Sequence, residues 1–246
     1  HQKEQVEGGY NASATSPSFG LMYKLNNNVS VYGNWMQGLI PGTEVSKKYA
    51  NKGQYLDPVK TTQREFGFKW DKGNLGGTLS YFHINQQVAY ADPVTNIYDY
   101  NGKQQSKGAS FTVYGDVTEK LHLLGGMSFM NVKNIGGTYD GNRYCGTPKW
   151  IGTLAMTYDV TDAFSLNTRL MYNSSAWADN KNTKKIGAWT RLDLGAKYKW
   201  TNMKNPMTLS CNVINVLGHK YWYGAGDNSV YLGTPRTFVV SLGIDF

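Results

Sequence analysis

Aromatic side chains that also carry a hydrogen-bonding group are the residues of this chain best suited to bind a ligand. The 246 residues include 18 Tyr and 7 Trp. An aromatic face packs on apolar groups, while a phenol hydroxyl or an indole N–H donates a hydrogen bond at its edge. These residue types predict non-covalent recognition, and the candidates for it are Tyr98, Tyr100, Trp177, Tyr221, Trp222, Tyr223 and Tyr231.

Signals for catalysis or direct metal binding are poor. The four histidines are isolated in the sequence and lack partners at metal-ligand spacing: His1, His83, His122 and His219. No G-x-S-x-G nucleophile motif is present. Paired glycines, such as Gly76–Gly77 and Gly125–Gly126, lie within alternating stretches and suit sheet curvature better than a phosphate loop. We therefore predict no enzyme activity, no catalytic residues, no metal site and no directly bound cofactor.

The elements that must position the aromatic residues are strands. In residues 188–200, Leu192, Leu194 and Tyr198 fall on even positions, whereas Arg191 and Asp193 fall on odd positions. A strand places these two sets on opposite faces. No run approaches the roughly 20 apolar residues that a membrane helix needs. An overall hydrophobic fraction of only 40% still fits a transmembrane barrel, in which every second residue is apolar.

The same period predicts eleven strands. We place them at 19–25, 28–37, 60–71, 74–86, 105–116, 121–129, 150–159, 164–173, 188–200, 206–216 and 237–246. Short connections (26–27, 72–73, 117–119, 161–162 and 201–205) alternate with long ones (38–59, 87–104, 134–146, 175–187 and 217–233). Short turns at one end and long loops at the other are typical of outer-membrane barrels.

The aromatic residues near the strand ends fit the same interpretation. Trp70, Tyr158 and Tyr198 lie next to short turns, and Trp35 and Trp150 lie near long loops, as in the aromatic belts of membrane proteins. An odd number of up-and-down strands would close only through a parallel seam, and an open sheet would leave bare edges in lipid. We therefore predict an all-β, antiparallel transmembrane β-barrel of which this chain is one part. The polar residues 1–18 would end a long loop.

Several stretches in order along the chain resemble the C-terminal part of the barrel of TonB-dependent siderophore receptors. They include SVYGNWMQGLIPGT at 30–43, TTQREFGFKWDKGNLGGTLSYFHI at 61–84, WTRLDLGAKY at 189–198, NVINVLGHKYW at 212–222 and GTPRTFVVSLGIDF at 233–246. The resemblance covers most of residues 17–246 and is strongest to the ferrichrome-like, hydroxamate branch.

The resemblance implies a 22-stranded barrel, with residues 1–246 as its C-terminal portion and an N-terminal plug domain absent from this sequence. It implies a Gram-negative outer-membrane receptor that binds a ferric siderophore, signals occupancy to the plug, and imports the siderophore with energy delivered by TonB. Iron would be present only as the siderophore chelate. The C-terminus would be periplasmic and the long loops extracellular. An aromatic residue of the last long loop would reach the ligand.

Two further expectations concern partners. The resemblance implies that Phe246 is read by the barrel-assembly machinery as an insertion signal. The loop lysines Lys47, Lys48, Lys52, Lys181, Lys184 and Lys185 belong to a chain of formal charge +8, which raises the possibility of nucleic-acid binding. Because these lysines are scattered over separate loops, contacts to outer-membrane lipid and lipopolysaccharide or steering of an anionic chelate are favoured over nucleic-acid binding. A simply solvated loop surface is favoured over all of these functional roles.

Other interpretations remain open at this level. The same receptor class could carry haem, cobalamin or a glycan. A passive porin would lack a plug, and a soluble β-rich binding module would need no detergent. Cys145 is expected on an extracellular loop and Cys211 in mid-membrane on the lipid face, so the strand placement predicts that they form no disulfide.

Overall fold

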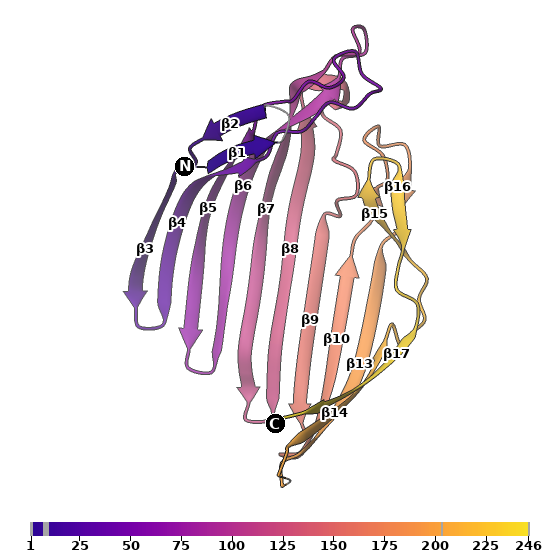
Figure 1. The fold of residues 1–246 in the computed structure, drawn as a ribbon. Coiled ribbons are helices and arrows are strands. Elements are labelled where there is room, and N and C mark those ends of the chain that lie inside the picture. The colour runs from indigo at the N-terminus through magenta and orange to yellow at the C-terminus, as the bar shows by residue number, and fades with distance from the viewer. Residues whose placement is uncertain (1, 7–9, 203, 246) are drawn as a thin grey trace.

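A single curved sheet dominates the structure, a computed structural model that describes residues 2–6, 10–202 and 204–245 (Figure 1). In these residues eleven strands form one antiparallel sheet in sequence order. Its members are β3 (Ser18–Asn26), β4 (Val29–Ile40), β5 (Val59–Lys72), β6 (Leu75–Ala91), β7 (Tyr98–Thr118), β8 (Leu121–Ile135), β9 (Trp150–Asp159), β10 (Phe164–Asn173), β13 (Trp189–Trp200), β14 (Met207–Ile214) and β17 (Thr237–Ile244). The eleven strands predicted from alternation are confirmed.

The strand register assembles one face that is apolar across the sheet, here called the apolar face. Tyr23 pairs with Val31, Val31 with Phe68, and Phe68 with Leu79. Towards the other edge of the sheet, Leu194 pairs with Thr168 on one neighbouring strand and with Val213 on the other, and all three share this face. These side chains are largely exposed, including Phe66, Leu79, Leu194, Phe238 and Val240. Because exposed apolar side chains on every strand are unfavourable in water, the apolar face is suited to lipid.

The opposite face, here called the polar face, carries small and charged side chains. Ser110 and Ser128 face each other on β7 and β8, with their hydroxyl oxygens 2.8 Å apart. Phe82 interrupts the alternation of β6 because its ring lies over Gly108 of β7, where any Cβ would collide with it. Glycine thus provides the space for a large side chain on a crowded concave surface.

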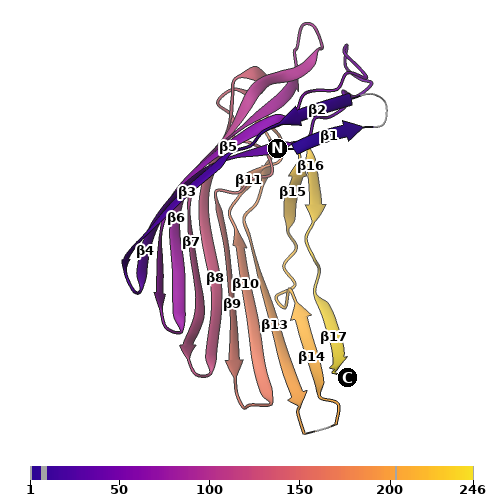
Figure 2. The same cartoon turned by 60° about the vertical axis from the view of Figure 1, so that its left-hand side comes forward.

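Both edges of the sheet are open in the described residues, because no further strand pairs with β3 or β17 on its outer side. Figures 1 and 2 show the sheet as a trough with β3 and β17 at opposite margins. An unpaired strand edge presents free backbone N–H and C=O groups, which are costly to leave in lipid. The predicted incompleteness of the barrel is therefore consistent with this topology.

The connections differ from the prediction at the long-loop end. Residues 87–104 were expected to form a loop, but β6 and β7 continue as a hairpin to Ala91 and Tyr98. Short hairpins also form in the opening segment and in two other predicted loops: β1 (Gln2–Val6) with β2 (Tyr10–Ala14), β11 (Ala176–Trp177) with β12 (Lys185–Ile186), and β15 (Trp222–Gly226) with β16 (Ser229–Leu232). These segments lack two-residue alternation because they extend beyond the apolar band, so the sequence pattern missed their backbone pairing.

The packed interior of the described residues lies among the long loops. The buried apolar residues there include Val45, Leu56, Cys145, Ala176, Ile186 and Tyr221. A 3-10 turn, η1 (Gly137–Tyr139), follows β8. No described helix has the length and apolarity required to cross a bilayer. The loops therefore form an ordered cap over one end of the sheet, and this cap positions the candidate aromatic residues.

Candidate functional site

The aromatic candidates divide into two positions: some hold the loop cap together, and others are displayed on its surface. Tyr98 belongs to the first group. Its ring stacks on Tyr49 with 4.6 Å between centroids, and Asn51 exchanges two hydrogen bonds with the Tyr98 backbone. Tyr100 donates a hydrogen bond of 3.0 Å to the carbonyl oxygen of Asp57. Both tyrosines therefore attach the β4–β5 loop to the extended β6–β7 hairpin.

Tyr221 is the most buried of the candidates, with 6% of its surface exposed. Its ring stacks on Trp189 of β13 with 4.2 Å between centroids and covers Gly233, where a Cβ would lie 2.3 Å from the ring. Arg191 donates a hydrogen bond of 3.4 Å to the Tyr221 hydroxyl. These contacts give Tyr221 a packing role beneath the last loop, with little surface left for direct contact with a ligand.

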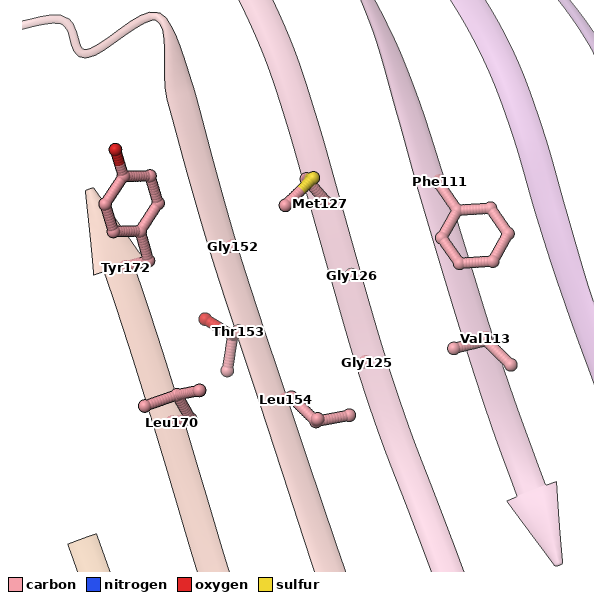
Figure 3. A pocket seen from close by; sticks show the side chains of 10 residues that line it. All are labelled: Phe111, Val113, Gly125, Gly126, Met127, Gly152, Thr153, Leu154, Leu170 and Tyr172. Carbon is pink, nitrogen blue, oxygen red and sulfur yellow. The ribbon is translucent and has the colours of Figure 1, made fainter. Parts of the chain in front are cut away.

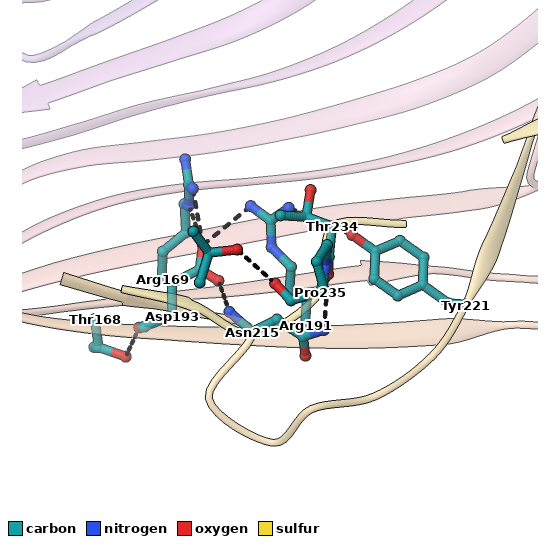
Figure 4. Close-up of polar contacts among 9 residues, drawn as sticks. Thr168, Arg169, Arg191, Asp193, Asn215, Tyr221, Thr234 and Pro235 are labelled. Carbon is teal, nitrogen blue, oxygen red and sulfur yellow. Dashed lines mark hydrogen bonds and ion pairs between the residues drawn. The ribbon is translucent and has the colours of Figure 1, made fainter. Parts of the chain in front are cut away.

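The polar face supports Tyr221 through a network centred on Asp193 (Figure 4). Arg169 donates two hydrogen bonds to Asp193 Oδ2, from Nε at 3.0 Å and from Nη2 at 2.8 Å. Arg191 Nη2 donates to the same oxygen at 3.0 Å. The Asn215 backbone N–H donates to Asp193 Oδ1 at 2.8 Å. Two guanidinium groups share one carboxylate, so the cluster carries an excess positive charge, and the half-exposed Arg169 presents it to the space above the polar face.

Asn215 fixes the beginning and the end of the last loop together. It is fully buried and adopts a left-handed backbone conformation with φ of 53°. Its side-chain amide donates to the carbonyl oxygens of His219 and Thr234, both at 2.9 Å, and accepts from the His219 N–H. Asparagine is among the few residues that adopt this conformation readily. The loop between β14 and β17 is therefore closed at its base by one side chain.

The β15–β16 hairpin displays the remaining candidates of the last loop. Trp222, Tyr223 and Tyr231 are 52%, 44% and 60% exposed, and the two tyrosine rings lie 5.8 Å apart. The hairpin reverses at Asp227 and Asn228, with Asn228 in the left-handed region at φ 57°. These three aromatic residues are the candidates with the most surface available to a ligand.

A pocket of about 340 Å³ separates this hairpin from β12. Lysine side chains and aromatic residues contribute to its walls, which include Lys185, Lys220, Tyr221, Trp222, Ala178 and Ile186. Lys185 also places its Nζ 5.6 Å above the Trp177 ring, a cation–π arrangement that partly covers this candidate. The pocket combines apolar walls with positive charge, which suits a ligand that is partly apolar and rich in acceptor oxygens.

Asp179 orders the loop that carries Trp177. Burial would raise the pKa of its carboxyl group, but hydrogen bonds from the Lys184 and Thr183 backbone N–H groups and the Thr183 hydroxyl outweigh burial and hold the pKa below its ordinary value. Asn180 N–H donates to Asp227 Oδ1 at 2.8 Å, linking this loop to the β15–β16 hairpin. The loop surface is thus cross-linked by polar contacts between segments distant in sequence.

Several of the residues that build this site were not recognised as site residues in the sequence. Tyr49 and Trp189 form ring stacks with candidates, and Lys220 lines the pocket. Trp189 had a detectable signal, since it shares a strand face with Arg191 and Asp193. Tyr49 and Lys220 lie in segments without a regular pattern, so only the packing of the loops identifies them.

Other sequence predictions have different outcomes. Phe246 lies outside the described residues, so its role stays a prediction. Cys145 and Cys211 are both free thiols, as expected; Cys145 is buried in the loop cap and Cys211 is exposed on the apolar face. Burial raises the pKa of the Cys145 thiol to about 11. No group of metal-ligating side chains was found within the portion of the chain that the structure describes.

Comparison with known proteins identifies similar chains. The family model described as "TonB dependent receptor-like, beta-barrel" matches residues 2–216. The ferrichrome receptor FcuA of Yersinia enterocolitica is 30% identical over 97% of this chain and 33% of its own length. The metal-pseudopaline receptor CntO of Pseudomonas aeruginosa is 27% identical over 95% of this chain and 34% of its own length.

Among solved structures, BauA, the ferric preacinetobactin receptor of Acinetobacter baumannii, superimposes with a TM-score of 0.84. It is 29% identical, and the match covers 96% of this chain and 37% of that protein. The present chain therefore spans about a third of the length of the relatives it matches. The eleven-stranded sheet of this chain therefore corresponds to part of the β-barrel of that receptor structure.

Proposed function

This chain belongs to the TonB-dependent receptor β-barrel family, and from this membership we propose that it is the C-terminal portion of an outer-membrane receptor for a ferric siderophore. The observation that carries the proposal is the combination of an apolar face on all eleven strands of the sheet with a cap of aromatic loops at one end of it. The family consists of transporters, so no covalent chemistry is assigned to the chain. The receptor would act by conformational change.

The remaining strands of the barrel and a plug domain would lie outside these 246 residues. The open edges of β3 and β17 support this, since each needs a partner strand to be stable in lipid. Eleven further strands would give the 22-stranded barrel expected from the sequence. Ligand occupancy would be signalled to the plug, which TonB would then displace. In this arrangement the long loops are extracellular and the end of β17 faces the periplasm.

The polar face would line the barrel interior and contact the plug. Arg169 is half exposed there. It and Arg191 pair with the single carboxylate of Asp193, so the cluster keeps one net positive charge. On β5, Glu65 accepts hydrogen bonds from Tyr32 and Gln63, while Lys69 lies over the Tyr32 ring. These polar groups are suited to hydrogen bonds and ion pairs with a plug domain, which would hold it in the barrel.

The ferric siderophore would bind through its organic chelator, and iron would keep its own ligands. The exposed rings of Trp222, Tyr223 and Tyr231 form the proposed primary contact surface, with Trp177, Tyr98 and Tyr100 contributing their smaller exposed areas. Tyr221 would act mainly by supporting the hairpin. A ferrichrome-like hydroxamate is the first cargo to test, because the relative FcuA is a ferrichrome receptor. The relatives CntO and BauA are receptors for pseudopaline and preacinetobactin chelates, so these are the next cargoes to test.

Binding to the intact, detergent-solubilised receptor tests the proposal through quenching of tryptophan fluorescence by ferrichrome. We expect submicromolar binding, and Trp222→Ala should weaken it by about 1–2 kcal/mol, or roughly 5- to 30-fold in Kd. Trp70→Ala is the matched control, because Trp70 lies on the apolar face at the short-turn end and remains far from the loops.

Two results would change the proposal. Absence of ferrichrome binding, with binding of a catecholate chelate, haem or cobalamin instead, would replace the cargo but keep the receptor class. Failure of every chelate to bind, together with steady ion conductance in planar bilayers, would replace the receptor by a passive porin.

A further inference from the structure

One part of the polar face consists largely of side chains that donate hydrogen bonds. It is formed by the inward residues of β10, β13 and β14 and is here called the donor wall. Strand pairing places Asn167 of β10, Gly195 of β13 and Asn212 of β14 side by side on it. By alternation, Gly195 shares its face with Asp193 and Lys197. The donor wall therefore runs from the Asp193 network towards the short turns.

Gly195 leaves a notch in the donor wall, and two amide side chains converge above it. A Cβ at Gly195 would collide with Asn212 Oδ1 and would lie 2.5 Å from Asn167 Oδ1. Neither amide forms a hydrogen bond with another residue in the part of the chain that the structure describes. Each amide can therefore turn its NH2 group towards a ligand in the notch and donate to an acceptor oxygen.

Cations flank the notch along the strands. Arg169 of β10 lies two residues closer to the loop cap, is half exposed and belongs to the Asp193 network (Figure 4). Lys197 and Lys199 follow Gly195 at two and four residues, roughly 7 and 13 Å away. Neither lysine forms an ion pair with another described residue. Asp193 is the one carboxylate of these three strands and two arginines share it, so the donor wall is positively charged.

A polar pocket of about 270 Å³ lies at the short-turn end of the donor wall. Lys197 and Lys199 line it, and so do the carboxylates Glu119, Asp159 and Asp162. The carboxylates offset the lysines at this end. A ligand rich in acceptor oxygens would therefore be held less tightly at the turns than at the notch.

A second surface with a glycine floor shows what distinguishes the notch. On the apolar face, Gly125 and Gly152 leave a hollow of about 350 Å³ (Figure 3). Its walls are formed mainly by apolar side chains, such as Phe111, Leu154 and Leu170. That hollow suits hydrocarbon, whereas the amides and cations of the donor wall suit a ligand with exposed oxygens.

We propose that the notch at Gly195 is a relay site, where the ferric chelate is held inside the barrel after it leaves the loop cap. The amides of Asn167 and Asn212 and the ammonium group of Lys197 would donate hydrogen bonds to oxygens of the organic chelator. Iron would keep its own ligands. The relay site rests on the proposed function, because the donor wall would face the plug until TonB displaces it.

The relay site is separated from the proposed primary contact surface. Gly195 is four residues along β13 from Arg191, the residue that donates to Tyr221 beneath the last loop, a distance of roughly 13 Å. A chelate bound on the β15–β16 hairpin would not touch the notch. Changes at the notch should therefore lower the rate of import and leave the affinity of the resting receptor unchanged.

Uptake of radiolabelled ferrichrome by cells that produce the intact receptor tests the relay site. Ferrichrome affinity is measured in parallel by tryptophan quenching on the purified receptor. Gly195→Val fills the notch and displaces both amides. We expect the maximal uptake rate to fall roughly fivefold to tenfold, with Kd changed by less than about twofold. Gly152→Val is the matched control, because it adds the same side chain on the apolar face, where a Cβ would lie 3.8 Å from its nearest neighbours.

A second pair of variants tests the charge and does not depend on how Gly195→Val folds. Lys197→Gln should lower the maximal uptake rate roughly threefold to tenfold with Kd unchanged, because a charge-assisted hydrogen bond becomes a neutral one. Lys69→Gln is the matched control, since Lys69 also lies on the polar face near the short turns, but over Tyr32 on β5. An equal loss of uptake in both variants would indicate a general effect of interior charge and would overturn the relay site.

The remaining outcomes separate the relay site from the receptor proposal. Uptake rates are expressed per receptor assembled in outer-membrane fractions, so lower assembly is not counted as slower import. Unchanged rates in both Gly195→Val and Lys197→Gln overturn the relay site while the proposed function stands. A Kd weakened in proportion to the lost uptake also overturns it, since it would place these residues in the primary contact surface. Absence of ferrichrome binding to the unaltered receptor would instead contradict the proposed cargo and remove the premise.

Discussion

Replacement of Asp193 should destabilise the receptor more than replacement of any exposed carboxylate of similar size. Asp193 accepts hydrogen bonds from Arg169, Arg191 and the Asn215 backbone, and its side chain is only 10% exposed. Asp193→Ala removes one carboxylate and leaves four N–H donors, contributed by three residues, without their acceptor. Arg191 would be the most affected, because its side chain is only 12% exposed and its Nε already lacks a partner.

The magnitude follows from the burial of each partner. Removal of one member of a buried ion pair costs about 3–5 kcal/mol, whereas an exposed pair contributes about 0–1 kcal/mol. Arg191 is near the first limit and the half-exposed Arg169 near the second. Since Arg191 keeps its hydrogen bond to Tyr221, we expect Asp193→Ala to lower the free energy of unfolding by about 3 kcal/mol. Asp193→Asn keeps an acceptor for Asn215 and should lose about half as much.

Urea-induced unfolding of the intact receptor in detergent, followed by tryptophan fluorescence, measures this change. Trp189 reports on the same region because it stacks on Tyr221, the partner of Arg191. Asp71→Ala is the control, since Asp71 is exposed near the short turn after β5. A loss below about 0.5 kcal/mol for Asp193→Ala, equal to that of the control, would refute the reasoning that this network holds the loop cap on the sheet.

Three further predictions concern other parts of the chain. Gly67→Val should destabilise the receptor by about 1–3 kcal/mol, because its Cβ would lie 2.6 Å from the Tyr32 ring; a double-mutant cycle with Tyr32→Ala should remove most of that cost, and an unchanged cost would contradict it. In a Cys211→Ser background, Cys145 should react slowly with a thiol reagent at pH 8 and about tenfold faster per pH unit up to its pKa of about 11, because burial raises that pKa and the thiolate is the reacting form; a plateau below pH 9 would disprove this. Deletion of Phe246 should lower the amount of assembled receptor in outer-membrane fractions, and unchanged amounts would remove its proposed role as an assembly signal.

The sequence alone determined the number of membrane-spanning strands and the face each residue occupies. Alternation is a local property: in β13, Leu192 and Leu194 face one way and Arg191 and Asp193 the other, whatever the neighbouring strands are. The odd strand count then followed by counting, and it predicted an incomplete barrel with open edges. The aromatic content of the loops could likewise be read directly, which identified the candidates without showing their surroundings.

Only the tertiary structure decided which aromatic residues are available to a ligand. Tyr221 and Trp222 are adjacent in sequence, yet the first is buried on Trp189 and the second is half exposed on the hairpin. The Asp193 network was hidden for a similar reason, since Arg169, Asp193 and Asn215 become neighbours only through strand pairing and loop packing. Contacts between segments 20 to 50 residues apart depend on which strands pair and how loops pack, and no local pattern encodes them.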